Sequence, residues 1–204
     1  MGNRVVIVNH RLSNLNSIAR ALEECGGEVV VTERGNNLAA ADRFVLPGVG
    51  AFPAAMRNLE ADGLADALRA EVARRSVPVL GICLGMQLMA SRGTEGECTD
   101  GLGLIPGEVV KFETADDERI PHIGWNSVDL ATDHPLFCGI ASGTDFYFVH
   151  SYHLRCDEAH VVARTPYCGA FVSSAANGMV MAVQFHPEKS QKAGFQVLRN
   201  FMAM

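Results

Sequence analysis

The sequence predicts an α/β fold, a three-layer sandwich in which helices cover both faces of a largely parallel central sheet. Short apolar, β-branched runs alternate with amphipathic stretches along the first ninety residues, which is typical of parallel strands joined by helices. A cysteine framed by glycines directly follows one of these runs. The chain has 204 residues, enough to bury a core without disulfide or metal support, and we interpret residues 1–204 as one domain.

The first half of the chain is expected to form a βαβαβ unit. Its first helix carries apolar residues with the i, i+3, i+4, i+7 spacing of one helix face, and Gly26-Gly27 should end it. Pro53 stands where proline is preferred at the start of a helix. The expected strands are residues 5–8, 28–32 and 44–46, and the expected helices begin at Leu15, with Ser13 or Asn14 as N-cap, and cover residues 53–60 and 64–75.

Residues 77–87, with the sequence VPVLGICLGMQ, contain the clearest functional motif. The apolar run indicates a buried strand, and Cys83 stands where this strand turns into a helix. Gly81 and Gly85 frame it with the spacing of a nucleophile elbow, in which small neighbours leave a side chain exposed on a tight turn. Backbone N–H groups at a helix start favour a thiolate, and the N–H of Leu84 could hold an oxyanion. Although most apolar cysteines are inert core residues, this frame makes Cys83 the candidate nucleophile.

Residues 47–50, Pro-Gly-Val-Gly, follow the third expected strand. Because ligands of parallel sheets gather beyond the carboxyl ends of the strands, this segment should lie near Cys83. Its glycines permit unusual backbone angles, so that a peptide N–H here could turn toward an oxyanion. Taken alone, an ordinary Gly/Pro turn is the simpler interpretation, and it is the neighbouring elbow that favours a functional one.

His186 and Glu188 follow the last strand-like segment of the second half. A cysteine nucleophile needs a general base within hydrogen-bond reach, and an imidazole base needs a carboxylate that fixes its tautomer. His-x-Glu at a strand end supplies both groups together. On sequence alone, His122, His150 and His153 remain alternative bases. The other strand-like segments of this half are residues 108–112, 123–130, 145–150 and 161–164, and a helix with Phe195, Leu198 and Phe201 closes the chain.

Composition excludes several classes of partner and cofactor. The net charge of −6 and the absence of a Lys/Arg run argue against nucleic acid or a membrane surface, and no apolar stretch approaches transmembrane length. Six cysteines without a C-x-x-C pair predict reduced thiols and a cytoplasmic protein. Neither a metal-ligand spacing nor a phosphate-binding Gly-x-x-x-x-Gly-Lys-[Ser/Thr] loop occurs, so we expect no metal and no cofactor.

The motifs LPGVG at residues 46–50, GICLGMQ at 81–87 and QFHPEKS at 184–190 together resemble the class I (triad) glutamine amidotransferases. They are most similar to the glutaminase subunits of imidazole glycerol phosphate synthase, which pair with a (βα)8-barrel cyclase in histidine biosynthesis. PHIGWN at residues 121–126 and YFVHSY at 147–152 also resemble that subfamily. The resemblance implies a flavodoxin-like three-layer fold and a heterodimer that acts on L-glutamine.

The resemblance also implies a role for individual residues. Cys83 would attack the glutamine side-chain amide, His186 would act as base and then acid, and Glu188 would orient His186. The N–H groups of Val49 and Leu84 would form the oxyanion hole. Gly50, Gln87, Glu95, Ser151 and Tyr152 match positions that hold glutamine, and Asn14, Trp125 and Lys189 are candidates for the partner interface.

One segment departs from the family pattern. Relatives carry Asp-Tyr-Gly-x-Gly-Asn after the first strand, whereas residues 9–14 read Asn-His-Arg-Leu-Ser-Asn. Because this loop lies on the partner side in the family, a glutaminase subunit that feeds a different acceptor enzyme, such as a sugar amidotransferase, is an alternative. A stand-alone γ-glutamyl cysteine hydrolase is another, since such elbows serve many acyl-transfer reactions. A binding module with a relic site is a third, but it predicts a damaged triad, and all three residues are present.

Overall fold

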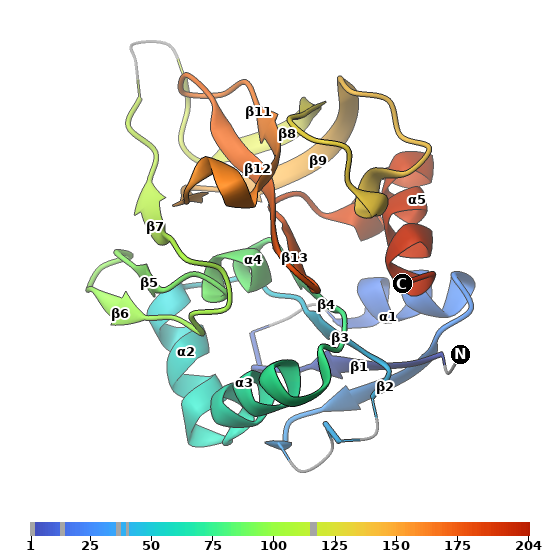
Figure 1. Cartoon of the computed structure of the whole chain (residues 1–204). Coiled ribbons are helices and arrows are strands. Elements are labelled where there is room, and N and C mark those ends of the chain that lie inside the picture. The colour runs from blue at the N-terminus through green and yellow to red at the C-terminus, as the bar shows by residue number, and fades with distance from the viewer. Residues whose placement is uncertain (1–2, 13–14, 36–37, 40, 115–117) are drawn as a thin grey trace.

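Five parallel strands form the central part of the sheet in the computed structural model (Figure 1). Their spatial order is β2, β1, β3, β4, β13, so that the fourth strand pairs with the last one. The strands are β1 (Arg4–Val8), β2 (Glu28–Thr32), β3 (Arg43–Leu46), β4 (Val79–Ile82) and β13 (Val180–Val183). The structure describes residues 3–204 except 13–14, 36–37, 40 and 115–117, and the expected N-cap at Ser13 or Asn14 lies outside the described residues.

Beyond β13 the sheet continues mainly with antiparallel strands, and one branch of it reaches β8 and β9. These strands are β5 (Arg92–Gly93), β6 (Thr99–Asp100), β7 (Glu108–Lys111), β8 (His122–Leu130), β9 (Thr144–His150), β10 (Tyr152–Arg155), β11 (Val161–Thr165) and β12 (Phe171–Asn177). Among the described residues there are also short 3-10 helices: η2 (Pro135–Phe137) lies between β8 and β9, η3 (Glu158–His160) between β10 and β11, and η4 (Pro187–Lys189) after β13.

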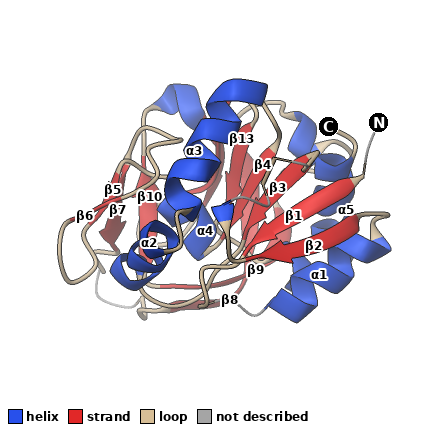
Figure 2. Cartoon of the chain, turned by 90° about the horizontal axis from the view of Figure 1, so that it is seen from below, coloured by secondary structure: helices blue, strands red, loops and turns tan. Residues whose placement is uncertain are grey.

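Helices cover both faces of the parallel strands, which confirms the predicted three-layer α/β fold (Figure 2). The alternating side chains of β1 show the two cores directly: Val5 and Ile7 belong to the core under α1 and α5, and Val6 and Val8 to the core on the other side. The helices are α1 (Leu15–Glu24), α2 (Phe52–Ala61), α3 (Leu64–Arg75), α4 (Leu84–Leu88) and α5 (Gln191–Met202).

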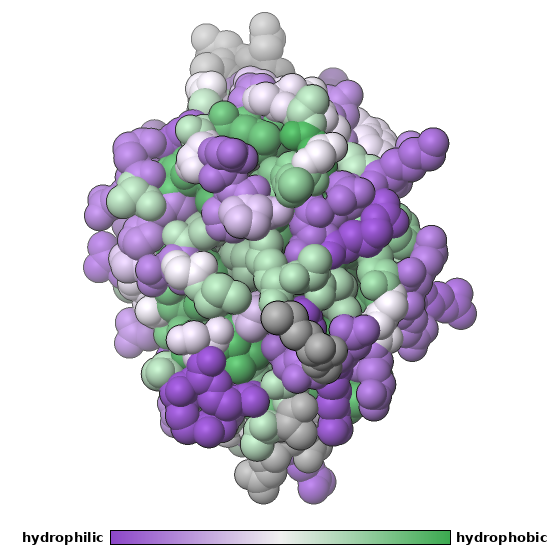
Figure 3. Space-filling view, turned by 45° about the vertical axis from the view of Figure 1, so that its right-hand side comes forward, coloured by the Kyte–Doolittle hydropathy of each residue, from purple (hydrophilic) through white to green (hydrophobic). Residues whose placement is uncertain are grey.

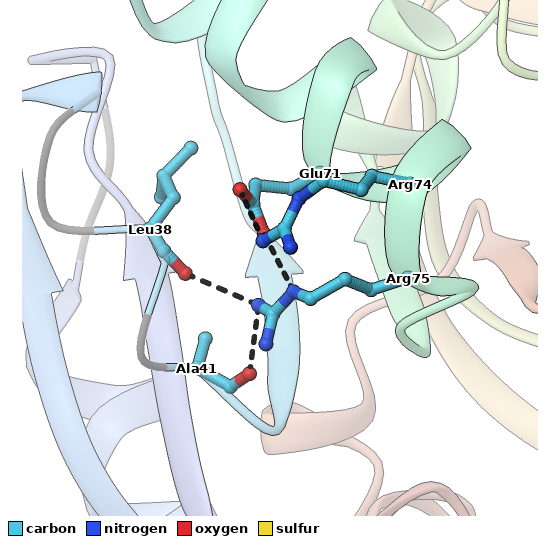
Figure 4. A network of polar contacts seen from close by, with 5 residues as sticks. All are labelled: Leu38, Ala41, Glu71, Arg74 and Arg75. Carbon is cyan, nitrogen blue, oxygen red and sulfur yellow. Dashed lines mark hydrogen bonds and ion pairs between the residues drawn. The ribbon is translucent and has the colours of Figure 1, made fainter.

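The C-terminal turn of α3 is tied to the loop that precedes β3 (Figure 4). Arg75 donates hydrogen bonds to the carbonyl oxygens of Leu38 and Ala41, at 3.4 and 3.0 Å. Glu71, one turn earlier, accepts from Arg75 at 2.6 Å and from Arg74 at 3.0 Å. Arg75 therefore donates to the loop carbonyls, and the Glu71 carboxylate on the same helix balances its charge.

Hydrophilic and hydrophobic residues are interspersed on the face of the molecule in Figure 3, where the hydrophobic residues show as green areas. Within the part of the chain that the structure describes, no helix is both long and apolar enough to cross a bilayer.

Candidate active site

Cys83 lies at the turn between β4 and α4, with the backbone angles φ 54° and ψ −109°. A non-glycine residue rarely adopts a positive φ, and such strain is found mainly at functional sites. The side chain is 5 % exposed and lines a cavity of about 290 Å³. Cys83 is thus buried, but its side chain borders a cavity large enough for a small molecule.

The two glycines of the frame are required by close backbone contacts. A Cβ on Gly85 would lie 1.7 Å from the carbonyl oxygen of Leu46, and a Cβ on Gly81 would lie 2.9 Å from the Gly85 backbone. Side chains at either position would push α4 away from the sheet. The frame therefore lets a helix begin directly against β3, with Cys83 at its first turn.

Replacing Gly85 by alanine should lower the unfolding temperature by roughly 10 °C, because the added carbon overlaps backbone atoms that cannot move independently. Gly26→Ala is the matched control, because Gly26 has φ +89° and nothing lies near the position of an added Cβ. Alanine there should cost only about 1–2 kcal/mol of backbone strain and should lower the unfolding temperature less than Gly85→Ala does. Thermal unfolding of both variants checks the prediction. Equal stability of the two variants would contradict the packing role of Gly85.

The pairing of β4 with β13 brings His186 toward Cys83. Ile82 is opposite Val183, so the residues after both strands leave the sheet at the same edge, and the N–H of Cys83 bonds to the carbonyl oxygen of Val183 at 2.9 Å. His186 Nδ1 donates to Glu188 Oε1 at 2.8 Å, and both side chains are buried. Among the described residues, the other ring nitrogen, Nε2, has no hydrogen-bond partner. The carboxylate thus fixes the tautomer that leaves Nε2 free to take a proton.

Electrostatics at His186 favour a charged imidazolium. Burial alone lowers the pKa of His186, but the negative charge of a Cys83 thiolate and the hydrogen-bonded Glu188 carboxylate outweigh it and raise this pKa to about 10. The sulfur also lies 3.8 Å from the carbonyl oxygen of Val149, which can accept a hydrogen bond only from the protonated thiol. The raised pKa of His186 depends on the thiolate form of Cys83, and a thiolate–imidazolium pair is the hypothesis that the experiments below test.

The three alternative bases have a different environment. Burial lowers the pKa of His122 and of His153 to about 4 and that of His150 to about 3, so these rings are neutral at physiological pH. His122 and His150 bond to each other, and His153 stacks on Phe112. Of these four described histidines, His186 alone has a hydrogen-bonded carboxylate.

The five residues that the resemblance assigns to glutamine binding lie around the cavity at Cys83. Gln87 uses both N–H groups inside the protein, on the carbonyl of Tyr152 at 2.9 Å and on Gln184 at 3.1 Å, so its oxygen is left for a ligand. One Glu95 oxygen accepts the Phe52 N–H at the start of α2, at 2.7 Å. The cavity is lined by Val49, Gly50, Cys83, Leu84, Gln87, Glu95, Pro121, Val149, His150, Ser151 and Tyr152.

The two expected oxyanion donors differ in this conformation. Leu84 is the first residue of α4, where an N–H has no partner within the helix. The N–H of Val49 instead donates to the carbonyl oxygen of Leu12 at 3.0 Å, away from the cavity. Gly50, directly after it, has φ +104°, and a Cβ on Gly48 would lie 2.5 Å from the His10 ring. The segment is therefore held by the loop after β1, with one donor directed elsewhere.

Comparison with known proteins identifies the family. The model of "Glutamine amidotransferase class-I" matches residues 6–204. The chain belongs to the class I glutamine amidotransferase family. Among its relatives, the imidazole glycerol phosphate synthase subunit HisH 1 of Campylobacter jejuni (strain 81-176) is 44% identical, over 97% of this amidotransferase and 98% of the relative. The subunits HisH of Moorella thermoacetica and Methanocaldococcus jannaschii are 46% and 44% identical, each over 97% of this chain and over 93% and 98% of the relatives.

Solved structures share the fold of this amidotransferase. The crystal structure of a glutamine amidotransferase matches with a TM-score of 0.77 at 20% identity, covering 97% of this chain and 97% of the other. The structure of PurLQS from Thermotoga maritima matches with a TM-score of 0.78 at 20% identity, covering 100% and 99%. These likenesses agree with the three-layer architecture described above.

The amidotransferase exposes apolar side chains beside the site. Trp125 is 49 % exposed and packs edge-on against Tyr147, whose ring lies 5.8 Å from the Lys189 ammonium. Val49 is 41 % exposed, and it lines with Lys189 a small cavity next to His186. These contacts connect the exposed apolar residues to residues 47–50, the segment that contains the expected oxyanion donor Val49 and that we call the oxyanion segment. Asn14, the third candidate for the partner interface, lies outside the described residues.

Proposed function

We propose that this chain is the glutaminase subunit of an imidazole glycerol phosphate synthase. In this proposal, residues 1–204 act as one cytoplasmic domain that hydrolyses L-glutamine to L-glutamate and ammonia. A (βα)8-barrel cyclase partner uses the ammonia to make imidazole glycerol phosphate and AICAR in histidine biosynthesis. The observation that carries the proposal is the Cys83–His186–Glu188 group beside a cavity lined by all five expected glutamine-binding residues, in a chain 44–46% identical to HisH subunits.

The reaction follows from the positions of these groups. The Cys83 thiolate attacks the side-chain amide carbon of glutamine and forms a tetrahedral oxyanion, which the N–H of Leu84 and, once reoriented, that of Val49 would bind. The His186 imidazolium gives its proton to the amide nitrogen and the C–N bond breaks. Ammonia departs, and a glutamyl thioester remains on Cys83. Water then loses a proton to His186 and attacks the thioester, which releases glutamate and regenerates the thiolate.

A partner enzyme gives this reaction its use. Ammonia released into water is protonated and lost as a nucleophile, so the site should open toward an enzyme that consumes it. The exposed Trp125 and Val49 beside the site support docking at this face, since partly apolar patches with aromatic residues are typical of interface centres.

The isolated chain should be a poor glutaminase, and a cyclase partner with its acceptor bound should raise turnover on the order of 10²- to 10³-fold, the usual effect of one oxyanion donor. The reason is that Val49 donates to Leu12, and the glycine-flanked peptide needs only a local rotation to point at the cavity. Glutamate release is measured for the chain alone, with the cyclase, and with cyclase plus acceptor. Glutamine binding is measured in parallel and should change little.

Two other outcomes select the alternatives. Full turnover by the isolated chain would exclude the inactive resting state and would favour a stand-alone γ-glutamyl hydrolase. Activation by a different synthase but not by the cyclase would favour a paralogous subunit, which the changed loop at residues 9–14 keeps as the second candidate. In that loop, His10 Nε2 donates to the Pro47 carbonyl oxygen at 2.8 Å, so the departure from the family lies against the oxyanion segment itself.

A further inference from the structure

Gln184 is a buried polar residue directly after β13 for which the proposed reaction has no role. Its side chain is 0 % exposed, and its Nε2 lies 3.7 Å from the Cys83 sulfur. Its Oε1 lies 3.1 Å from Gln87 Nε2. Gln184 begins the QFHPEKS motif, but sequence reasoning gave it no role, because a single glutamine carries no chemical signal of its own.

The orientation of both amides is fixed by a backbone carbonyl. The backbone carbonyl oxygen of Tyr152 can only accept a hydrogen bond, so the Gln87 side-chain atom 2.9 Å from it is the nitrogen. The second N–H of that nitrogen points to Gln184, so the Gln184 atom facing it is the oxygen. The Gln184 N–H groups therefore lie on the other side, toward the sulfur. The protein thus directs a neutral donor at the nucleophile.

The same carbonyl fixes two histidines. His150 Nδ1 lies 2.8 Å from the Tyr152 oxygen and must carry a proton, so its Nε2 accepts from His122 Nδ1 at 3.1 Å. His122 Nε2 in turn accepts from Asn126 Nδ2 at 3.3 Å. Asn126 cannot be flipped, because its oxygen accepts the Ser127 N–H at 2.8 Å and its nitrogen donates to a backbone carbonyl. A continuous chain of hydrogen bonds therefore runs from the half-buried Asn126 through His122, His150, the Tyr152 carbonyl and Gln87 to Gln184.

We propose that Gln184 is a further catalytic residue, which stabilises the Cys83 thiolate through its N–H, and that His150 and His122 are positioning residues that hold this donor through Tyr152 and Gln87. The inference rests on the proposed role of Cys83 as nucleophile. A donor to the charged form lowers the pKa of a thiol, and a buried site strengthens the effect. Because the donor is neutral, it leaves the proton of His186 available for the leaving nitrogen.

Other ionisable groups lie around the same cavity and must stay in place during a test. His186 with Glu188 follows β13, His150 comes from β9, and Glu95 lines the same cavity. Substitution of Gln184 by methionine keeps the length of the side chain and adds no charge. It therefore removes the donor without adding a second electrostatic change.

The test is the pH dependence of Cys83 alkylation by iodoacetamide in the full chain, followed by mass spectrometry of the Cys83 peptide. Gln184→Met should lower the alkylation rate at neutral pH about tenfold, because the Cys83 thiolate loses a hydrogen-bond donor at 3.7 Å. The exposed Cys98 is an internal control and should react unchanged. His150→Phe should lower the Cys83 alkylation rate less than Gln184→Met does, and His160→Gln, at a histidine outside the cavity lining, should leave this rate unchanged.

A second measurement does not depend on a variant that folds. Nitrogen NMR of the wild-type chain should show His150 and His122 both protonated at Nδ1 and unprotonated at Nε2 at neutral pH. Protonation at Nε2 of either ring, or unchanged Cys83 alkylation in folded Gln184→Met, would overturn the inference. Neither measurement uses glutamine, so a wild-type chain that fails to hydrolyse glutamine would refute the proposed function separately.

Discussion

Replacement of Cys83 by alanine should abolish glutamine hydrolysis, with a loss on the order of 10⁴- to 10⁶-fold, because the thioester pathway has no other nucleophile. Synthesis driven by added ammonium salts should survive in the complex with the cyclase, since only the ammonia-producing half uses the thiol. The measurement compares glutamine-dependent and ammonia-dependent product formation by the same reconstituted complex. Cys98→Ala is the matched control, because Cys98 is exposed and does not line the cavity.

The same variant should change the charge of the neighbouring imidazole. A Cys83 thiolate stabilises the protonated form of His186, so removing it should lower the pKa of His186 from its raised position. An NMR titration of His186 in wild type and Cys83→Ala measures the shift. Glutaminase turnover in folded Cys83→Ala comparable to wild type would refute the assignment of the nucleophile, and an unchanged His186 titration would refute the thiolate–imidazolium pair.

The parallel strands could be predicted because each is short, apolar and bounded by glycine or polar residues. The strand at residues 28–32 coincides with β2, and the strand at residues 44–46 lacks only Arg43 of β3. Arg43 was missed because charge is a poor guide here: the residue is buried, and its Nε donates to a carbonyl of α5 at 3.3 Å. A charged residue inside a strand needs a tertiary partner that no local pattern shows.

β12 could not be predicted, although it is the bridge between the parallel and antiparallel parts of the sheet. It contains Ser173 and Ser174, both 0 % exposed, so it shows neither the alternation of a half-buried strand nor the apolar run of a buried one. Ser174 satisfies its hydroxyl on the Ala182 carbonyl of β13 at 2.9 Å. Such a strand is recognisable only after its neighbours are known.

The sequence predicts those residues of the candidate site that belong to local motifs. Cys83 with its glycines and His186 with Glu188 are two short signals, and the parallel pairing of β4 with β13 explains why they meet. The direction of the Val49 N–H could not be predicted, because its acceptor is the carbonyl oxygen of Leu12 in another loop. Backbone hydrogen bonds between loops leave no trace in residue type, and the roles of all these residues stay predictions for the experiments above.

His186→Ala should lower glutamine hydrolysis by a factor similar to Cys83→Ala, on the order of 10⁴- to 10⁶-fold, whereas Glu188→Gln should keep roughly a hundredfold more activity. The base moves the proton in both half-reactions, but the carboxylate acts on the chemistry only through the ring. Glutamine in place of Glu188 can still accept the hydrogen bond from Nδ1 that Glu188 accepts at 2.8 Å. It lacks the negative charge that stabilises the imidazolium. Glutamate release by the activated complex measures both variants.

The pH dependence separates these two roles. The Glu188 carboxylate raises the pKa of His186, so its loss should lower that pKa and move the loss of the imidazolium to lower pH. Glu97→Gln, which removes a carboxylate from a surface ion pair with Arg57, is the control and should change neither rate nor profile. If His186→Ala and Glu188→Gln both had negligible effects, the base would lie elsewhere, and the neutral His150 in the cavity wall would be the first residue to substitute. If instead both variants lost activity equally and the titration of His186 in Glu188→Gln were unchanged, the carboxylate would be holding the fold of the η4 turn and not the charge of the ring.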